Sequence, residues 1–338
     1  MKQNIGLNAL KVLMILFVIF IHENPSLEKN GEVVMWWHSV VVVAVPVFFT
    51  LSGYFFFKNV RDFTFSNYKQ KLKKRAKTLL FPYVIWNCFP VLFVVVGNLY
   101  SIIFRHKNTT DLFAFLQGLW DEGLWHIWWD KTSEMMPFDS PLWYVRDLMI
   151  LCVCSPLIYY AIKYLQWGVV LVFMGLYIAG ISFPIGLSLT GFLFFSLGAT
   201  FALKGLPLAL PMVGGAKITY YAVTLIAFLL CNMLKVWWIH AVFILTSCYA
   251  WVLLFHDLKG KWAEHIAQYS DAVFFVLALH NIIVLANVGK MTEKLFTGNL
   301  HLICYWIVPF ITLVICVVLY VTLRKFFPKM TALLCGGR

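Results

Sequence analysis

Long apolar runs separated by short polar stretches make up most of the chain, and this pattern predicts the fold. A helix needs about 20 mainly apolar residues to cross a bilayer. Runs near that length cover 7–25, 36–57, 79–103, 141–162, 166–184, 186–203, 217–234, 237–255, 272–289 and 302–323. No repeat of about 20–50 residues is present, and the longest polar interval, Arg105 to Ser140, is too short for a soluble domain. We therefore predict an all-α, polytopic membrane protein of about ten transmembrane helices, with residues 1–338 as one domain.

The composition excludes a water-soluble globule. Of the 338 residues, 62% are hydrophobic and 12% are charged, whereas soluble domains contain about 45–50% apolar and roughly 25% charged residues. The eight cysteines show neither the Cys/His spacing of a metal site nor a paired extracellular framework. We therefore predict no bound metal and interpret the cysteines as small apolar side chains.

The distribution of positive charge predicts the orientation. The chain has 27 Lys and Arg residues against 15 Asp and Glu residues. In a soluble protein this excess would suggest nucleic acid, but in a membrane protein cations collect in cytoplasmic loops. With the N-terminus in the cytoplasm, 18 cations fall in cytoplasmic segments, 7 in outer segments and 2, Lys11 and Arg146, within spans. We therefore predict that both termini are cytoplasmic, and we expect no nucleic-acid partner.

Two ionisable residues of the first span are predicted to share one helix face. Lys11 and His22 are eleven residues apart, which places them within about 20° of each other and about 16 Å apart along the axis. Lys11 then lies toward the cytoplasm and His22 toward the outside. This helix face suits a molecule that has an anionic head and a reactive end held deep in the membrane. Alternatively, Lys11 snorkels to the inner interface and His22 is an interfacial histidine with satisfied hydrogen bonds.

The fourth span carries Arg146 and Asp147 at a depth similar to that of His22. Neighbouring residues on a helix point about 100° apart, so we expect each of the two to find its partner on another helix. Asp147 could orient His22, as a general base requires of a partner. Alternatively, the charges form an interhelical ion pair that fixes packing.

The second and ninth spans contain further polar groups. Ser52 and Gly53 follow Pro46 in the second span, an arrangement that permits close helix approach and is ordinary in membrane packing. His280 and Asn281 lie near the middle of the ninth span. A buried His–Asn pair is often a packing hydrogen bond; alternatively, His280 lines a reaction cavity.

A basic cluster and an aromatic-rich interval lie on opposite sides of the membrane. The cluster runs from Lys69 to Lys77. It either anchors the chain on anionic headgroups of membrane lipids or binds the phosphates of a nucleotide-bearing donor such as CoA, with bidentate contacts from Arg75. The outer interval suits an interfacial aromatic belt or stacking on a sugar. Its tryptophans are Trp120, Trp125, Trp128 and Trp129.

Five of these motifs, taken in order, resemble acyltransferase family 3, a family of membrane O-acyltransferases. They are Lys11 and His22 with ten residues between them, 48–54, 74–83, 141–147 and 274–281. The first two are similar to the family's Arg/Lys-X10-His and Phe-Phe-x-x-Ser-Gly elements. The others are similar to its basic Pro-Tyr, Trp-aromatic-x-Arg-Asp and late aromatic-His elements. Lys11 stands where Arg is common in the family.

The resemblance implies about ten helices, a cytoplasmic acyl-CoA donor and a glycan acceptor, which is often lipid-linked. We therefore predict an O-acyltransferase of the bacterial cytoplasmic membrane, with acetyl as the acyl group because no feature argues for a longer chain. His22 becomes the catalytic base and Asp147 its orienting partner. Lys11, Lys74 and Arg75 become donor-binding cations. Acceptor contacts are predicted for Ser52, Trp143, Arg146 and His280.

Two other classes of protein stay open from the residues alone. A transporter or flippase for a lipid-linked or small polar substrate would use the same intramembrane charges along a translocation path, although such proteins often show internal repeats and paired broken helices. A structural or sensory membrane protein would use these charges only for packing. In that case a His22→Gln exchange would leave glycan acylation unchanged.

Overall fold

The computed structural model is helical, and no β-strand occurs among the residues it describes. These residues are 4–23, 27–60, 62–105, 113–114, 117, 136–183, 187–296 and 301–337. The four tryptophans of the predicted outer interval lie outside them. The first half contains α1 (Ile5–His22), α2 (Leu27–Val41), α3 (Ala44–Phe57), α4 (Phe65–Arg75), η1 (Ala76–Leu80), α5 (Phe81–Arg105), η2 (Ser140–Leu142), α8 (Trp143–Val153) and α9 (Ser155–Leu165). The second half contains α10 (Gly168–Ile178), α11 (Leu189–Leu203), α12 (Gly215–Leu234), α13 (Trp237–His256), α14 (Lys261–Ala267), η3 (Gln268–Ala272), α15 (Val273–Leu279), η4 (His280–Val284), α16 (Leu285–Leu295), α17 (His301–Phe326) and α18 (Pro328–Leu334).

Within the described ranges, 7 helices are long and apolar enough to cross a membrane. They are Ile5–His22, Gly31–Phe57, Phe65–Ser101, Gly215–Leu234, Trp237–His256, Lys261–Leu295 and Ile303–Phe326. Helices α8 and α9 meet at 62° and add an eighth crossing if they form one broken span. The shorter apolar helices α10 and α11 coincide with the predicted spans 166–184 and 186–203. The all-helical, multi-pass fold is thus confirmed, whereas the count of ten and the cytoplasmic termini stay predictions.

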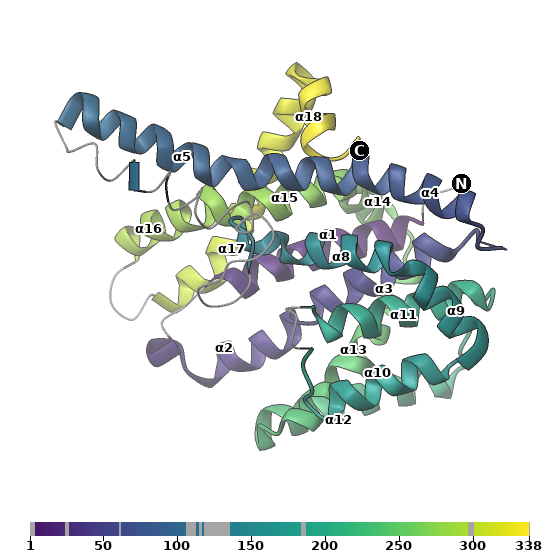
Figure 1. The fold of residues 1–338 in the computed structure, drawn as a ribbon. Coiled ribbons are helices and arrows are strands. Elements are labelled where there is room, and N and C mark those ends of the chain that lie inside the picture. The colour runs from purple at the N-terminus through teal and green to yellow at the C-terminus, as the bar shows by residue number, and fades with distance from the viewer. Residues whose placement is uncertain are drawn as a thin grey trace.

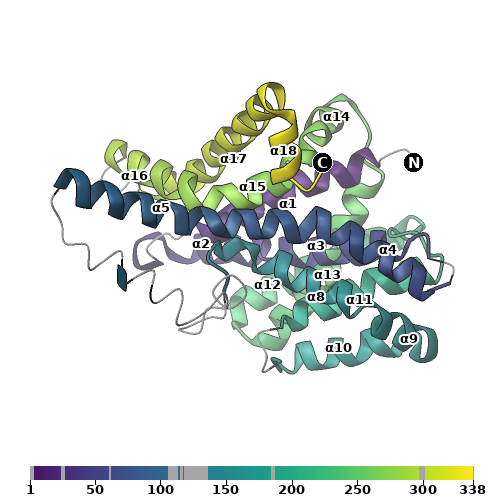
Figure 2. The same cartoon turned by 45° about the horizontal axis from the view of Figure 1, so that its top comes forward.

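The helix ends gather in two groups at opposite sides of the molecule (Figures 1 and 2). The N-terminal end of α1, α4 and α14 lie toward one side in both views, and α2 and α16 lie toward the other. The first group consists of segments predicted to be cytoplasmic, whereas α2 and α16 each combine a predicted outer segment with part of a predicted span. This arrangement is what helices that cross a bilayer alternately would produce.

Helix α1 lies inside the bundle and carries much of the core. It contacts α2, α3, α13, α14, α15 and α17, and Leu10, Met14 and Ile19 are fully buried on it. Its start is fixed by Asn4, whose side-chain amide donates to the carbonyl oxygen of His256 at 3.1 Å. Because lipid tails are as apolar as these side chains, the packing of α1 depends on close fit and hydrogen bonds. These contacts hold helix α1 in a defined orientation within the bundle.

Helices α3 and α11 approach each other at two glycines. A Cβ atom on Gly53 would collide with the carbonyl oxygen of Phe195, and one on Gly198 would collide with that of Thr50. Each helix therefore presses its backbone onto a glycine of the other, which is how small residues permit tight packing in membranes. The close approach predicted at Gly53 is confirmed, and it fixes how the neighbouring Ser52 is presented.

Two π-helical turns interrupt the helices beside the site described below. The turn η1 follows α4, and the turn η4 follows α15. A π-helical turn shifts side chains out of the α-helical register and is frequent at functional sites. Arg75 immediately precedes the first turn and His280 begins the second. Both residues therefore lie where the regular helix geometry changes.

Candidate active site

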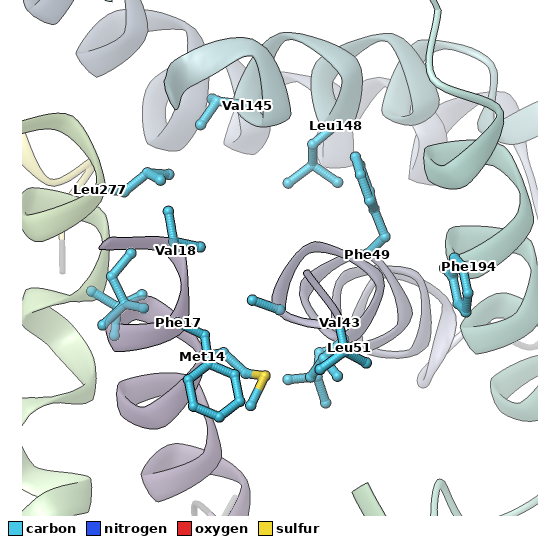
Figure 3. Close-up of a cluster of buried hydrophobic side chains, with 14 of the residues drawn as sticks. Met14, Phe17, Val18, Val43, Phe49, Leu51, Val145, Leu148, Phe194 and Leu277 are labelled. Atoms are coloured by element: carbon cyan, nitrogen blue, oxygen red, sulfur yellow. The ribbon is translucent and has the colours of Figure 1, made fainter. Parts of the chain in front are cut away.

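A cavity of about 460 Å³ lies among α1, α3, α8 and α15. Small-molecule sites in proteins usually measure about 300–1,000 Å³, so the volume fits a ligand of ordinary size. Much of the wall is apolar. Figure 3 shows Val145 and Leu148 facing the space beside Val18 and Leu277. These four residues and Leu51 all line the cavity.

One face of α1 forms a wall of this cavity, as the spacing of its polar residues predicts. Lys11, Ile15, Val18 and His22 all line it, and their helical spacing keeps them on one side of α1. The cation and the imidazole are about 16 Å apart along the axis. The cavity thus has a cationic end near Lys11 and an imidazole end near His22.

Lys11 and Arg75 bring positive charge to the cavity. The Nζ atom of Lys11 donates to Oδ1 of Asn8 at 3.0 Å, which holds the ammonium group near the wall. The carboxylate of Asp271 also lines the cavity, and it pairs with Arg324 at 3.4 Å. Two cations and one carboxylate therefore line the cavity, and the carboxylate is paired with Arg324.

A separate basic groove of about 610 Å³ runs along α4. Lys74 lines the groove, whereas the next residue, Arg75, lines the cavity. Helix α4 therefore contributes cations to both the cavity and the groove. Of the three predicted donor-binding residues, Lys11 and Arg75 line the cavity and Lys74 lines the groove. The lysines of the groove are Lys71, Lys73, Lys74 and Lys77.

The opposite end of the cavity brings two imidazoles together. The ring centres of His22 and His280 are 5.2 Å apart. His22 lines the cavity, but His280 is fully buried and does not, so the acceptor contact predicted for His280 has no support from the geometry. The Nδ1 atom of His280 lies 2.9 Å from the carbonyl oxygen of Val276. Its Nε2 atom has no hydrogen-bond partner in the described part of the chain.

Three polar or aromatic side chains from α3 and α8 complete the lining. The Oγ atom of Ser52 and the hydroxyl oxygen of Tyr144 are hydrogen-bonded at 3.0 Å, and both residues line the cavity together with Trp143. The Tyr144 ring packs against Phe49, with centroids 4.7 Å apart. Ser52 and Trp143 therefore line the cavity, and their contact with an acceptor stays a prediction.

Arg146 and Asp147 do not line the cavity; they pair with each other. Both are 3% exposed, and the Nε and Nη2 atoms of Arg146 each lie 2.9 Å from Oδ1 of Asp147. The expectation that neighbouring residues would not pair with each other is wrong, because the long Arg146 side chain folds back onto the next residue, whereas the partner expected for Asp147 on another helix is present. The Oδ2 atom of Asp147 accepts a hydrogen bond at 3.1 Å from the backbone N–H of Ser188, the N-cap of α11.

This ion pair fixes packing between α8 and α11. A negative charge at a helix N-terminus is favourable because the N–H groups there lack helical partners. The hydrogen bonds of Asp147 within the described residues go to Arg146 and Ser188, so no contact supports its predicted role of orienting His22. The acceptor contact predicted for Arg146 likewise finds no support, because the side chain lies outside the cavity lining.

Sequence reasoning missed two lining residues and one pairing. Tyr144 belongs to the motif that begins at Pro141, but its hydroxyl gave no separate signal. Asp271 precedes the ninth predicted span by one residue and was covered by no motif. The contact between His22 and His280 joins residues 258 positions apart, and no spacing rule reaches that far. No cluster of three or more His, Cys, Asp or Glu suited to a metal ion occurs among the described residues.

A multi-pass helical bundle that encloses a cavity with cations toward one end and the His22 imidazole at the other is an arrangement suited to a membrane-embedded enzyme. The family is given by comparison of the sequence with known proteins: the chain belongs to acyltransferase family 3, because the family's model, described as an acyltransferase domain, matches residues 4–322. The chain is therefore a multi-pass member of this family.

One curated relative adds a biological context. The chain is similar to the succinoglycan biosynthesis protein ExoH of Rhizobium meliloti (strain 1021), with 26% identity over 165 residues. The match covers 45% of this chain and 41% of that relative, so less than half of either protein is aligned. No solved structure gives a significant match.

Proposed function

We propose that this acyltransferase moves an acyl group, acetyl in the simplest case, from a cytoplasmic acyl-CoA to a hydroxyl of a cell-surface or lipid-linked glycan. The observation that carries the proposal is one cavity whose wall includes Lys11 and Arg75 as well as His22. This arrangement supplies an anion-binding region and a base about 16 Å apart. The proposed site of action is the bacterial cytoplasmic membrane.

The structure of the proposed donor suits the groove and the cavity together. Coenzyme A carries its phosphates on the nucleotide part and its thioester at the far end of the pantetheine arm. The groove lysines, with Lys74 among them, suit the nucleotide phosphates, and Arg75 can bind phosphate with two parallel hydrogen bonds. The arm would follow the α1 wall past Ile15 and Val18. This path would bring the thioester near His22.

His22 is proposed as the general base, because imidazole is the side chain most often used for this step. It accepts the proton of the acceptor hydroxyl while the oxygen attacks the thioester carbonyl carbon. The C–S bond then breaks, and the departing CoA sulfur receives that proton from His22. The products are an ester and free CoA thiol, so atoms and charge balance.

The acceptor is proposed to be a polysaccharide unit. The similar protein from Rhizobium meliloti is named for succinoglycan biosynthesis. In the cavity of this chain, Trp143 offers an aromatic face for a sugar ring, and Ser52 and Tyr144 offer hydroxyls. These groups suit a neutral sugar better than a charged acceptor.

The proposal is tested with the purified full chain in liposomes, using acetyl-CoA as donor and de-esterified succinoglycan oligosaccharide as acceptor. Release of CoA thiol and the mass increase of the oligosaccharide are both measured. The expected result is transfer by the wild type and a loss of about 10²–10⁴-fold in His22→Ala, the usual contribution of a general base. His38→Ala, on α2 and outside the cavity lining, is the matched control.

Two outcomes would overturn the proposal. Acetyl transfer at the wild-type rate by a folded His22→Ala protein would remove His22 from the chemistry. Movement of the oligosaccharide or its lipid-linked form across the liposome without any CoA, together with no acyl transfer, would favour a flippase. A series from acetyl- to octanoyl-CoA would define the acyl group.

A further inference from the structure

His280 is a buried polar side chain with one satisfied and one unsatisfied nitrogen. It is 0% exposed, and its Nε2 atom has no partner among the described residues. Leaving a buried acceptor or donor without a hydrogen bond costs free energy, and folded proteins rarely retain such an atom. The unsatisfied nitrogen therefore has hydrogen-bonding capacity that a neighbouring group could use.

The hydrogen bond at the other nitrogen determines what Nε2 can do. The carbonyl oxygen of Val276 can only accept, so Nδ1 of His280 must carry the hydrogen across the 2.9 Å contact. Neither nitrogen contacts a carboxylate in the described ranges, and a charged imidazole buried without a counter-ion is costly. In the neutral ring Nε2 then presents a lone pair, which is a hydrogen-bond acceptor.

The helix geometry brings this acceptor close to His22. His280 begins the π-helical turn η4, which contacts α1, and its ring centre lies 5.2 Å from that of His22. His22 lines the cavity, whereas His280 does not. The buried ring is thus adjacent to the base and separated from the ligand space.

We infer that His280 is the positioning residue for His22: its Nε2 lone pair accepts a hydrogen bond from the ring N–H of His22 that is not used on the acceptor. The inference rests on the proposed function, because it assigns a partner to the proposed base. No hydrogen bond joins the two rings in this structure, and hydrogen bonds in active sites often tighten only when substrate is bound. Forming this hydrogen bond therefore requires the two rings to move relative to each other.

This contact has a chemical consequence at each stage of the transfer. Before the reaction it selects the tautomer of His22 that leaves a lone pair on the cavity-facing nitrogen. When His22 has taken the hydroxyl proton, both of its ring nitrogens carry hydrogen. The His280 lone pair then accepts a hydrogen bond from the His22 N–H that faces away from the cavity, and this contact stabilises the charged ring. The proton then leaves to the CoA sulfur, and no proton passes to His280. Asp147, the carboxylate predicted for this role, is occupied by Arg146 and Ser188.

The test uses three exchanges at His280 in the liposome assay with acetyl-CoA and de-esterified succinoglycan oligosaccharide. His280→Leu removes the acceptor, His280→Gln retains one at the end of a chain of similar reach, and His280→Asn retains one on a shorter chain. We expect kcat to fall about 10–100-fold in the Leu variant, the usual effect of losing a residue that orients a functional side chain, with KM for acetyl-CoA unchanged. The Gln variant should keep most of kcat and the Asn variant should lose it. His240→Leu, on α13 and outside the cavity lining, is the matched control.

A double variant separates this inference from the proposed function. His22→Ala with His280→Leu should be no slower than His22→Ala alone, because a positioning residue acts only through the base. Wild-type kcat in a folded Leu variant would overturn the positioning role and leave the proposed function intact. If the Leu variant does not fold, equal kcat values in the Gln and Asn variants would overturn it. Activity retained in His22→Ala would instead overturn the proposed function.

Discussion

Two polar pairs lie within the membrane domain, and they differ in how completely they are satisfied. Arg146 and Asp147 are buried, joined by two contacts of 2.9 Å and linked to α11 through Ser188. His22 and His280 have ring centres 5.2 Å apart, but the buried Nε2 atom of His280 has no partner among the described residues. The first pair lies outside the cavity lining, and the second reaches it through His22.

This difference in hydrogen bonding gives a criterion for distinguishing structural from catalytic polar groups in such an apolar chain. Charge inside a bilayer costs about 2.5–3.5 kcal/mol per residue on insertion scales, so every such group needs a reason to be there. A pair that satisfies its hydrogen bonds internally stabilises the helices it joins. A pair with spare hydrogen-bonding capacity beside a cavity has groups left over for the proposed reaction. This criterion makes Asp147 a structural residue and agrees with the proposal of His22 as the base.

The largest effect is expected from Asp147→Ala. Removing one member of a buried ion pair leaves the other charge uncompensated, which costs about 3–5 kcal/mol. Denaturation in detergent micelles should show this loss, whereas the folded fraction should retain its kcat. An orienting carboxylate would behave differently, since its replacement in a hydrolase triad lowers kcat about 10⁴-fold.

The double exchange Arg146→Met with Asp147→Leu is the control for this prediction. It removes both charges together, so most of the lost stability should return. A double variant that is stable but catalytically dead would break the comparison, because the pair would then act in the reaction.

A smaller effect is expected from Gly53→Ala, one residue from the cavity-lining Ser52. The new Cβ would meet the carbonyl oxygen of Phe195, a backbone atom that cannot swing away. Overpacking of this kind costs about 1–3 kcal/mol, so the unfolding free energy in micelles should fall by that amount. Gly97→Ala on α5, where a Cβ meets nothing within 4 Å, should be neutral or slightly stabilising. Equal effects at both glycines would contradict the α3–α11 packing.

Ser52→Ala should have a milder consequence. It removes the 3.0 Å hydrogen bond to Tyr144, and a typical hydrogen bond contributes about 0.5–1.5 kcal/mol to stability. Tyr144→Phe should cost the same, and the double exchange should cost no more than either single one. KM for the oligosaccharide is the second measurement. A rise in both single variants would assign the two hydroxyls to the acceptor, whereas an unchanged KM would limit them to packing.

The sequence was sufficient for the parts of this picture that depend on one helix at a time. Apolar run length predicted the multi-pass helical fold, and helix periodicity placed Lys11 and His22 on the same wall. The Ser52–Gly53 pair predicted close helix approach. These inferences succeed because the geometry of a single helix follows from its residue spacing.

The features that the sequence did not predict depend on the length of a side chain or on contacts between segments far apart in the chain. The 100° rule describes where Cβ atoms point, but the Arg146 side chain is long enough to fold back to Asp147. Burial of His280 behind the cavity wall depends on η4 packing against α1, which no local pattern reports. Lys74 lines the groove and Arg75 lines the cavity because α4 lies between the groove and the cavity.

A pH-dependent effect is expected from Glu23, the residue that follows His22 at the end of α1. Burial, reinforced by the nearby Glu293 carboxylate, raises its pKa from the usual 4.5 to about 7, and a negative charge at a helix C-terminus is also unfavourable. The folded protein therefore binds this proton more tightly than the unfolded chain, so the stabilisation is complete below pH 4.5 and is lost as the pH rises toward 7. Glu23→Gln cannot ionise: its thermal midpoint should equal that of the wild type near pH 4.5 and exceed it above pH 7. Glu293→Gln should narrow this pH window, because it removes the second cause of the shift. A constant difference between the thermal midpoints of wild type and Glu23→Gln at all pH values would show that Glu23 ionises in the folded protein as it does in water.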